Sequence, residues 1–173
     1  YPDFPAEIRA PAGSLPGVVP AGEATTIEIE DRYLDTAGGA LRAVGLVARI
    51  RIGAGTRRLT VKSLARRGDG AVHRRLELEG DAGDGDEPRH WPPSAARDRR
   101  LGAIGEASLA TLAVLRQRRL QRDVGIGRSI VELSLDEIDV VAPGGETERW
   151  VELEGELRSG VEADLAALAD VLL

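Results

Sequence analysis

The chain has 173 residues, of which 42% are hydrophobic and 30% charged, and this composition fits one soluble domain with its own core. The absence of cysteine excludes disulfides, thiolate nucleophiles and cysteine-ligated zinc, and two histidines argue against a histidine-rich metal site. With a net charge of −6 and no apolar run near the roughly 20 residues that span a bilayer, we expect a cytoplasmic protein that binds neither nucleic acid nor membrane.

Strand patterns dominate the chain after an irregular opening over residues 1–24. Alternation of apolar and polar side chains predicts strands at 25–33, 47–52, 57–63, 73–79, 113–124, 129–141 and 148–157. The remaining predicted elements are a short helix or turn at 37–45, a loop at 80–93, a helix within 94–113 and a helix at 162–173. We therefore expect one domain over residues 1–173 that is mainly β (α+β), with seven or eight mostly antiparallel strands in a closed barrel or strongly curved sheet.

Several predicted strands carry a charge at every second position, as at Arg49 and Arg51 or at Glu152 and Glu154. Since successive side chains of a strand point to opposite faces, each of these strands has one charged face. Alternation alone favours charged faces that point outward into water, as in most antiparallel sheets. The rival arrangement turns them inward around water and a ligand, and the presence of both basic and acidic strands favours it.

Basic and acidic strands in one small domain suit a polyanion together with its metal ions. Guanidinium groups bind phosphate oxygens in pairs, and Lys62, the only lysine, would add a compact charge. Magnesium and manganese prefer carboxylate oxygen. Because phosphoryl transfer depends mainly on positioning and charge stabilisation, it requires no serine or cysteine nucleophile.

An ordered set of short motifs resembles the CYTH domain, also called the triphosphate tunnel metalloenzyme family. The motifs are Tyr33-Leu-Asp-Thr, Gly45-Leu-Val-Ala-Arg-Ile-Arg, Leu59-Thr-Val-Lys, Arg75-Leu-Glu-Leu-Glu, Leu115-Arg-Gln-Arg-Arg, Glu132-Leu-Ser-Leu-Asp and Val151-Glu-Leu-Glu. Their order and approximate spacing hold from about residue 25 to the end of the chain. The resemblance implies a closed, eight-stranded antiparallel tunnel with a few flanking helices, which binds a triphosphate or polyphosphate with Mg²⁺ or Mn²⁺. We expect a monomer or homodimer.

The resemblance also implies roles for individual residues. The phosphate ligands would be Arg49, Arg51, Lys62, Arg75, Arg116 and Arg118, with the register among the neighbouring arginines at 116–119 left open. The metal ligands would be Glu152, Glu154, Asp136, Glu77 and Glu79, the last two forming an acidic wall. Catalysis would depend on Glu152, Glu154 and Lys62. Structural alternatives are that Arg75 only pairs with a neighbouring glutamate and that Glu156 faces solvent.

One motif of the family does not occur in the sequence. The acidic first strand, Glu-x-Glu-x-Lys, has its nearest counterpart at Glu7 and Arg9, and we expect the true first strand to precede Tyr1.

Three functions follow from the resemblance. The first is metal-dependent hydrolysis of inorganic triphosphate or another small triphosphate. The alternatives are a polyphosphate-binding module without turnover and an adenylate cyclase.

Overall fold

The computed structural model describes residues 15–65, 72–73, 75–85, 87–141, 144–145 and 147–172. Its elements are β1 (Val18–Pro20), β2 (Thr25–Asp35), α2 (Ala40–Ala43), β3 (Leu46–Gly53), β4 (Thr56–Ser63), β5 (Glu77–Asp81), the 3₁₀ helix η1 (Pro88–His90), α3 (Ala95–Ile104), β6 (Ala110–Ile126), β7 (Ser129–Val141), β8 (Thr147–Ser159) and α4 (Glu162–Leu172). The first-strand candidates Glu7 and Arg9 lie outside the described residues. The mainly-β prediction is confirmed.

All eight strands belong to one antiparallel sheet with the order β5-β4-β3-β2-β6-β7-β8, and β1 pairs with β6 near its end. A closed barrel would require a ladder between the two outermost strands, β5 and β8. Among the residues that the structure describes, no such ladder forms, so the sheet is open and the closed-barrel prediction is corrected. The strand β5, five residues long, pairs with β4 along its whole length and lies at one edge of the sheet.

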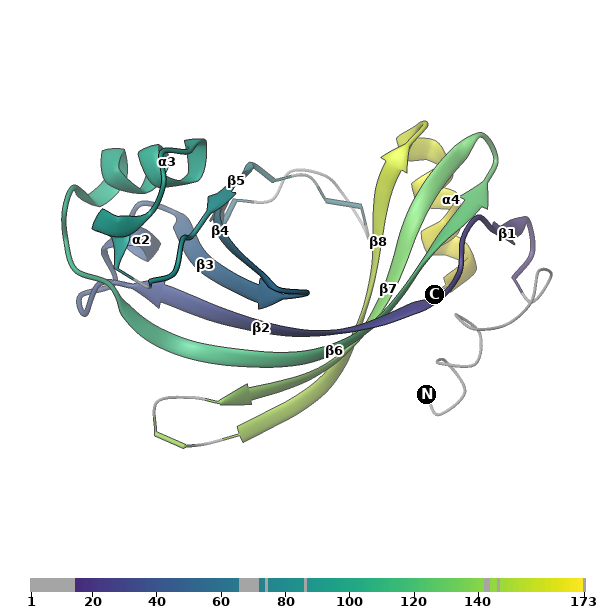
Figure 1. Cartoon of the computed structure of the whole chain (residues 1–173). Coiled ribbons are helices and arrows are strands. Elements are labelled where there is room, and N and C mark those ends of the chain that lie inside the picture. The colour runs from purple at the N-terminus through teal and green to yellow at the C-terminus, as the bar shows by residue number, and fades with distance from the viewer. Residues whose placement is uncertain are drawn as a thin grey trace.

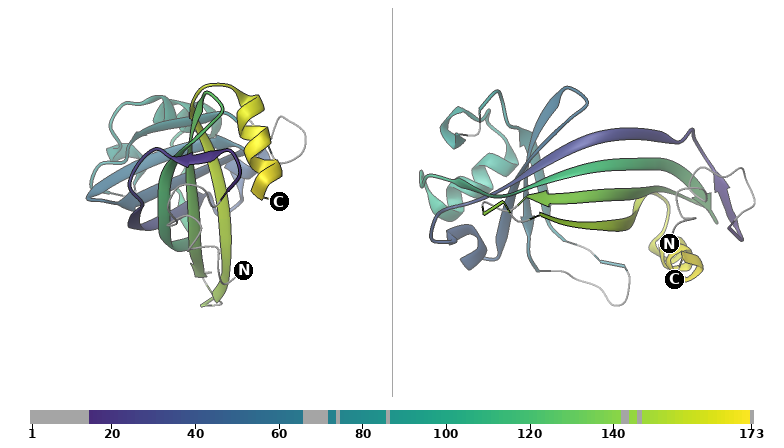
Figure 2. Two further views of the ribbon diagram at one scale, coloured as in Figure 1. Left: turned by 90° about the vertical axis from the view of Figure 1, so that its right-hand side faces the viewer. Right: turned by 90° about the horizontal axis from the view of Figure 1, so that it is seen from below.

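The sheet curves into a trough, with β3, β4 and β5 on one arm and β7 and β8 on the other (Figure 1). The long strands β2 and β6 form the floor, and they run beside β7 and β8 in the view from below (Figure 2). Helices α2 and α3 contact the first arm, and α4 contacts the second. All three lie outside the trough, so none of them covers the concave face of the strands.

Apolar side chains of the strands point to the convex side, where the helices cover them. On the first arm the alternate residues of β3 and β4 pack with Leu41 of α2, Ala96 of α3 and Trp91; these residues are Leu46, Ala48, Ile50, Leu59 and Val61. On the second arm, Val131 and Leu133 pack against Leu168 of α4. Because the convex side holds both cores, the charged faces of β3 and β4 turn inward, contrary to what alternation alone favours.

The segment that follows β2 is fixed by Asp35, the acidic residue of the Tyr33-Leu-Asp-Thr motif. Its carboxylate accepts hydrogen bonds from the backbone N–H groups of Thr36, Leu41 and Arg42 at 2.7, 2.8 and 3.1 Å. Burial alone would raise the pKa of Asp35, but these backbone donors lower it below its usual value. The motif therefore joins β2 to α2 by local capping, and Asp35 is used structurally.

Several boundaries differ from the sequence prediction, and the strand expected at 73–79 is observed as β5 at Glu77–Asp81. The lead-in contains the short strand β1, whose three residues are too few for a periodic signal. The helix within 94–113 ends at Ile104, and β6 begins at Ala110, earlier than expected. No described helix is long and apolar enough to cross a membrane.

Candidate functional site

The concave side carries a buried carboxylate at its floor, Asp31 of β2. Arg49 donates to Asp31 through Nη1 at 3.0 Å, and Arg51 donates through Nε at 2.8 Å and Nη2 at 2.7 Å. Gln117 of β6 adds a fourth bond from Nε2 at 2.9 Å. One carboxylate thus holds two guanidinium groups of β3 and an amide of β6.

A second carboxylate, Glu77 of β5, lies among three cations. Its oxygens are 2.8 Å from Lys62 Nζ, 3.8 Å from Arg49 Nη2 and 4.0 Å from Arg75 Nε. Burial lowers the pKa of Lys62, the charge of Arg49 lowers it further, and the attraction of Glu77 does not fully offset these effects. Three of the predicted phosphate ligands therefore converge on one anionic group.

A third cluster lies across the trough, on β6, β7 and β8. Arg119 donates to both oxygens of Asp136 at 2.7 and 2.5 Å and to Glu154 at 3.0 Å. Burial alone would lower the pKa of Arg119, but the hydrogen bonds to Asp136 and the charges of Asp136 and Glu154 raise it above its ordinary value. Glu152 is the ladder partner of Asp136, so it lies on the same face of the sheet.

The register of β6 separates its arginines into two groups. Gln117 and Arg119 face the trough, whereas Arg116 and Arg118, expected among the phosphate ligands, point to the convex side. There Arg116 lies 3.6 Å from Glu30, and Arg118 lies 3.9 Å from Glu28 and 3.6 Å from Glu137. Since side chains alternate along a strand, a shift of one residue exchanges the two groups.

Asp31, Gln117 and Arg119 were not among the site residues predicted from the sequence. A signal for Asp31 was present, because it shares a strand face with Ile27 and Ile29, where an isolated acid is unusual. Arg119 required the pairing of β6 with β7, which places it opposite Asp136. Neither the buried network nor this register follows from the spacing within one strand.

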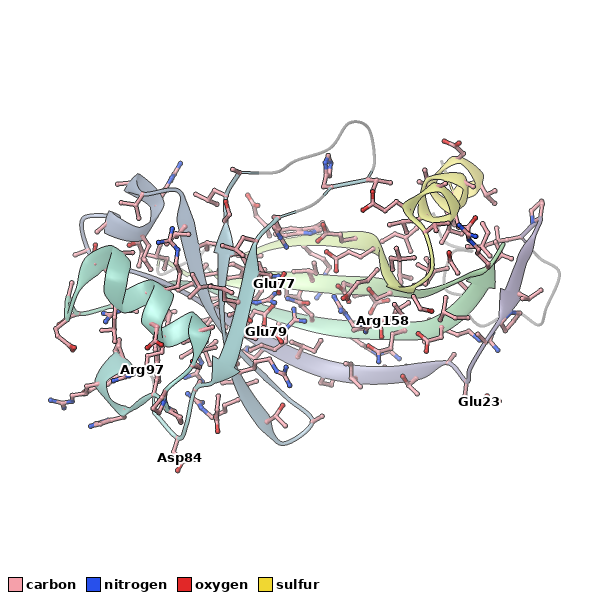
Figure 3. All side chains as sticks on the ribbon, turned by 90° about the horizontal axis from the view of Figure 1, so that it is seen from above. Glu23, Glu77, Glu79, Asp84, Arg97 and Arg158 are labelled. Atoms are coloured by element: carbon pink, nitrogen blue, oxygen red, sulfur yellow. The ribbon has the colours of Figure 1, made fainter. Side chains whose placement is uncertain are left out.

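The remaining predicted acid, Glu79, lies nearer the rim. It accepts a hydrogen bond from Arg58 at 2.7 Å, and both side chains are about half exposed. In the view from above, Glu77 and Glu79 lie along β5, and Arg158 lies on the opposite arm (Figure 3). Arg158 pairs with Glu132 at 2.6 Å and Glu156 at 3.1 Å, so Glu156 takes part in an ion pair there.

These carboxylates are hard oxygen donors, which is the ligand type that Mg²⁺ and Mn²⁺ prefer. In the described part of the chain no three acidic or histidine side chains are grouped to hold a metal ion as they stand. Glu77 and Glu154 instead neutralise Lys62 and Arg119. The donor chemistry fits a divalent cation, but metal binding would require these ion pairs to rearrange.

A separate open cavity of about 770 Å³ lies beside the end of α2 and the start of β3. It is lined mainly by apolar side chains, including Val44, Leu46 and Leu76, with Arg75 and Arg99 among its polar groups. Of the predicted site residues only Arg75 lines it, so the cavity does not coincide with the charged clusters.

The family model of the CYTH domain matches residues 13–173. The chain belongs to the CYTH domain family. The resemblance inferred from the ordered motifs is thereby confirmed. The search of curated protein sequences gave no significant match.

Two solved structures resemble this CYTH chain in fold. The first, from Hippeastrum, is described as a candidate adenylyl cyclase with a dominant triphosphatase activity; it has a TM-score of 0.62 at 20% identity, covering 86% of this chain and 73% of its own. The second is a candidate adenylate cyclase from Bacillus halodurans, with a TM-score of 0.51 at 15% identity and coverage of 85% and 73%. At these identities the likeness concerns the fold alone.

Proposed function

We propose that this CYTH chain hydrolyses inorganic triphosphate or another small triphosphate with the help of a divalent metal ion. The observation that carries the proposal is the convergence of Lys62, Arg49 and Arg75 on one carboxylate, with Arg51 held next to Arg49 by Asp31. Cations gathered on a concave face are suited to a polyanion. The triphosphatase activity of the Hippeastrum protein supports the same substrate class.

Phosphate binding would proceed by exchange of anions. The carboxylate of Glu77 is about one-third exposed and contacts the same cations that a phosphate oxygen would use. A triphosphate brings more charge than one carboxylate, and its oxygens can accept from Lys62 and Arg49 together. Glu77 would then leave Lys62 and become available to a metal ion.

The metal ion would be held by carboxylates on both sides of the trough. Glu152 and Glu154 of β8, with Asp136, would supply the main oxygen ligands, and Glu77 and Glu79 would supply the acidic wall of β5. When bound, the ion would neutralise charge on the phosphoryl oxygens. The side chains of Arg49, Arg51 and Lys62 would hold the phosphates, and a water molecule would attack the terminal phosphoryl group.

The proposal is tested by phosphate release from inorganic triphosphate, thiamine triphosphate and ATP in the presence of Mg²⁺ or Mn²⁺, with EDTA as the blank. We expect metal-dependent release from at least one of the three compounds. Binding of inorganic triphosphate without release would favour the polyphosphate-binding module. Conversion of ATP to cyclic AMP, measured by chromatography, would favour the cyclase. If the protein neither binds nor hydrolyses any of the three compounds, the proposal is contradicted.

The exchange of anions predicts that Glu77→Gln binds inorganic triphosphate more tightly than the wild type when EDTA is present. Removing the competing carboxylate should lower the Kd about fivefold, because an ion pair with one partly exposed partner contributes up to about 1 kcal/mol. Isothermal titration calorimetry measures the effect. The matched control is Glu87→Gln, which breaks the exposed pair with Arg89 away from the trough and should leave the Kd unchanged. Weaker binding by Glu77→Gln would contradict the exchange.

A further inference from the structure

The carboxylate of Asp31 is wholly buried, yet it lies next to the groups proposed to bind phosphate. Its neighbours on the same face of β2 are Ile29 and Tyr33, which are both uncharged side chains. Burying a charged carboxylate is unfavourable unless it is paired and fully hydrogen-bonded. An acid in this position therefore requires a physical explanation.

Asp31 meets that condition through its four hydrogen bonds. A carboxylate offers about four acceptor positions, and here Arg49, Arg51 and Gln117 occupy them. Burial alone would raise the pKa of Asp31, but the hydrogen bond from Arg51, the charges of Arg49 and Arg51 and the bond from Gln117 lower it. Asp31 is consequently ionised at neutral pH, with its orientation set from two neighbouring strands.

The bonds to Asp31 use only part of each guanidinium. Arg51 binds Asp31 through Nε and Nη2, which fixes the plane of its guanidinium group. Arg49 binds through Nη1, and its Nη2 faces Glu77. The Nε of Arg49 and the hydroxyl of Thr60, its ladder partner on β4, are buried groups without a hydrogen-bond partner within the described structure. Polar capacity is thus left over beside Arg49, on the side away from Asp31.

We propose that Asp31 is a positioning residue, which holds Arg49 and Arg51 so that their remaining N–H groups point at bound phosphate. The proposal rests on the proposed function, since it assigns Asp31 a task at the same site. A pure charge argument predicts the opposite effect of neutralising Asp31. Removing one negative charge beside the anion should tighten binding, whereas releasing the two guanidinium groups should weaken it.

The sign of the change therefore distinguishes the two explanations. Asp31→Asn keeps the shape of the side chain and removes its charge. We expect its Kd for inorganic triphosphate in EDTA to rise about tenfold, because the two guanidinium groups lose the charged acceptor that orients them. In the metal-dependent reaction KM should rise by a similar factor while kcat changes less than twofold.

The matched control is Asp139→Asn. Asp139 also binds an arginine in bidentate fashion, Arg149 at 2.5 and 3.0 Å, but on the convex side. The Kd of Asp139→Asn for inorganic triphosphate should equal that of the wild type.

A double-mutant cycle provides a further test. In the Asp31→Asn background, Arg49→Gln should weaken triphosphate binding much less than it does in the wild type, because Arg49 has already lost its orientation. A merely structural role would leave the cost of Arg49→Gln unchanged.

Asp31→Glu provides a second variant, which keeps the charge and displaces the carboxylate by one methylene group. Weaker binding by Asp31→Glu supports positioning, and wild-type affinity would overturn it.

Gln117→Leu is the variant to measure if neither Asp31 variant folds, because it removes one hydrogen-bond donor to Asp31 and alters no charge. A higher Kd for inorganic triphosphate supports the inference, and an unchanged Kd overturns it. If the wild type itself does not bind inorganic triphosphate, the proposed function fails. If the wild type binds and Asp31→Asn binds equally well or more tightly, only the inference about Asp31 fails.

Discussion

Arg49→Gln should raise the Kd for inorganic triphosphate about 30-fold, whereas Arg118→Gln should leave it within twofold of the wild type. Both substitutions remove one guanidinium charge, so their effects on net charge are equal. They differ in the face of the sheet. Arg49 points into the trough beside Lys62 and Glu77, and Arg118 pairs with Glu28 and Glu137 on the convex side. Calorimetry in EDTA measures both without interference from turnover.

This pair of variants tests the assignment of the concave side as the binding face. Arg49→Gln leaves Asp31 with its bonds to Arg51 and Gln117, so the protein should still fold. Thermal unfolding provides that check. Equal losses in the two variants would indicate binding through net charge alone, and a larger loss in Arg118→Gln would place the ligand on the convex side.

Glu154→Gln should reduce metal-dependent phosphate release at least about 100-fold, because the proposed metal would lose one of its main charged ligands. Higher Mg²⁺ or Mn²⁺ concentrations should restore part of the activity, since the defect lies in metal affinity. The change should not weaken binding of inorganic triphosphate in EDTA. Glu154 is half exposed, whereas its partner Arg119 keeps both bonds to the buried Asp136, so the fold should tolerate the substitution.

The control for Glu154→Gln is Glu137→Gln on β7. Glu137 is also about half exposed and paired with an arginine, but it lies on the convex side. We expect it to retain wild-type activity and the same dependence on metal concentration. Unchanged phosphate release by Glu154→Gln, at limiting metal, would remove Glu154 from the metal site.

Much of the fold followed from local patterns. Period-two alternation predicted seven of the eight strands, and the missing one, β1, has only three residues. The closed tunnel was not confirmed, because closure depends on how the outermost strands meet, and no pattern within a single strand encodes that contact. The direction of the charged faces also could not be read from alternation. It follows from the helices, whose packing takes the apolar side of each arm.

The part of the site on β3, β4 and β5 could be predicted from the sequence. The side chains of Arg49, Lys62 and Glu77 were expected together, and the structure brings them within ion-pair distance. Their roles in phosphate and metal binding remain predictions. The prediction failed to place Arg116 and Arg118 because three arginines within four residues allow two registers, and only the ladders to β2 and β7 decide between them.

The division of each strand between two faces has a consequence for how this domain can change. In β3, residues 48 and 50 belong to the core and residues 49 and 51 to the trough, and in β4 the same division separates 59 and 61 from 60 and 62. Alternate positions of these two strands thus belong either to the apolar core or to the face that would contact a ligand. A library that randomises the trough-facing positions of these strands, but keeps the pairing of Asp31 with Arg49 and Arg51, would vary what the trough accepts and leave the apolar core unchanged, which makes the domain a convenient starting point for new anion receptors.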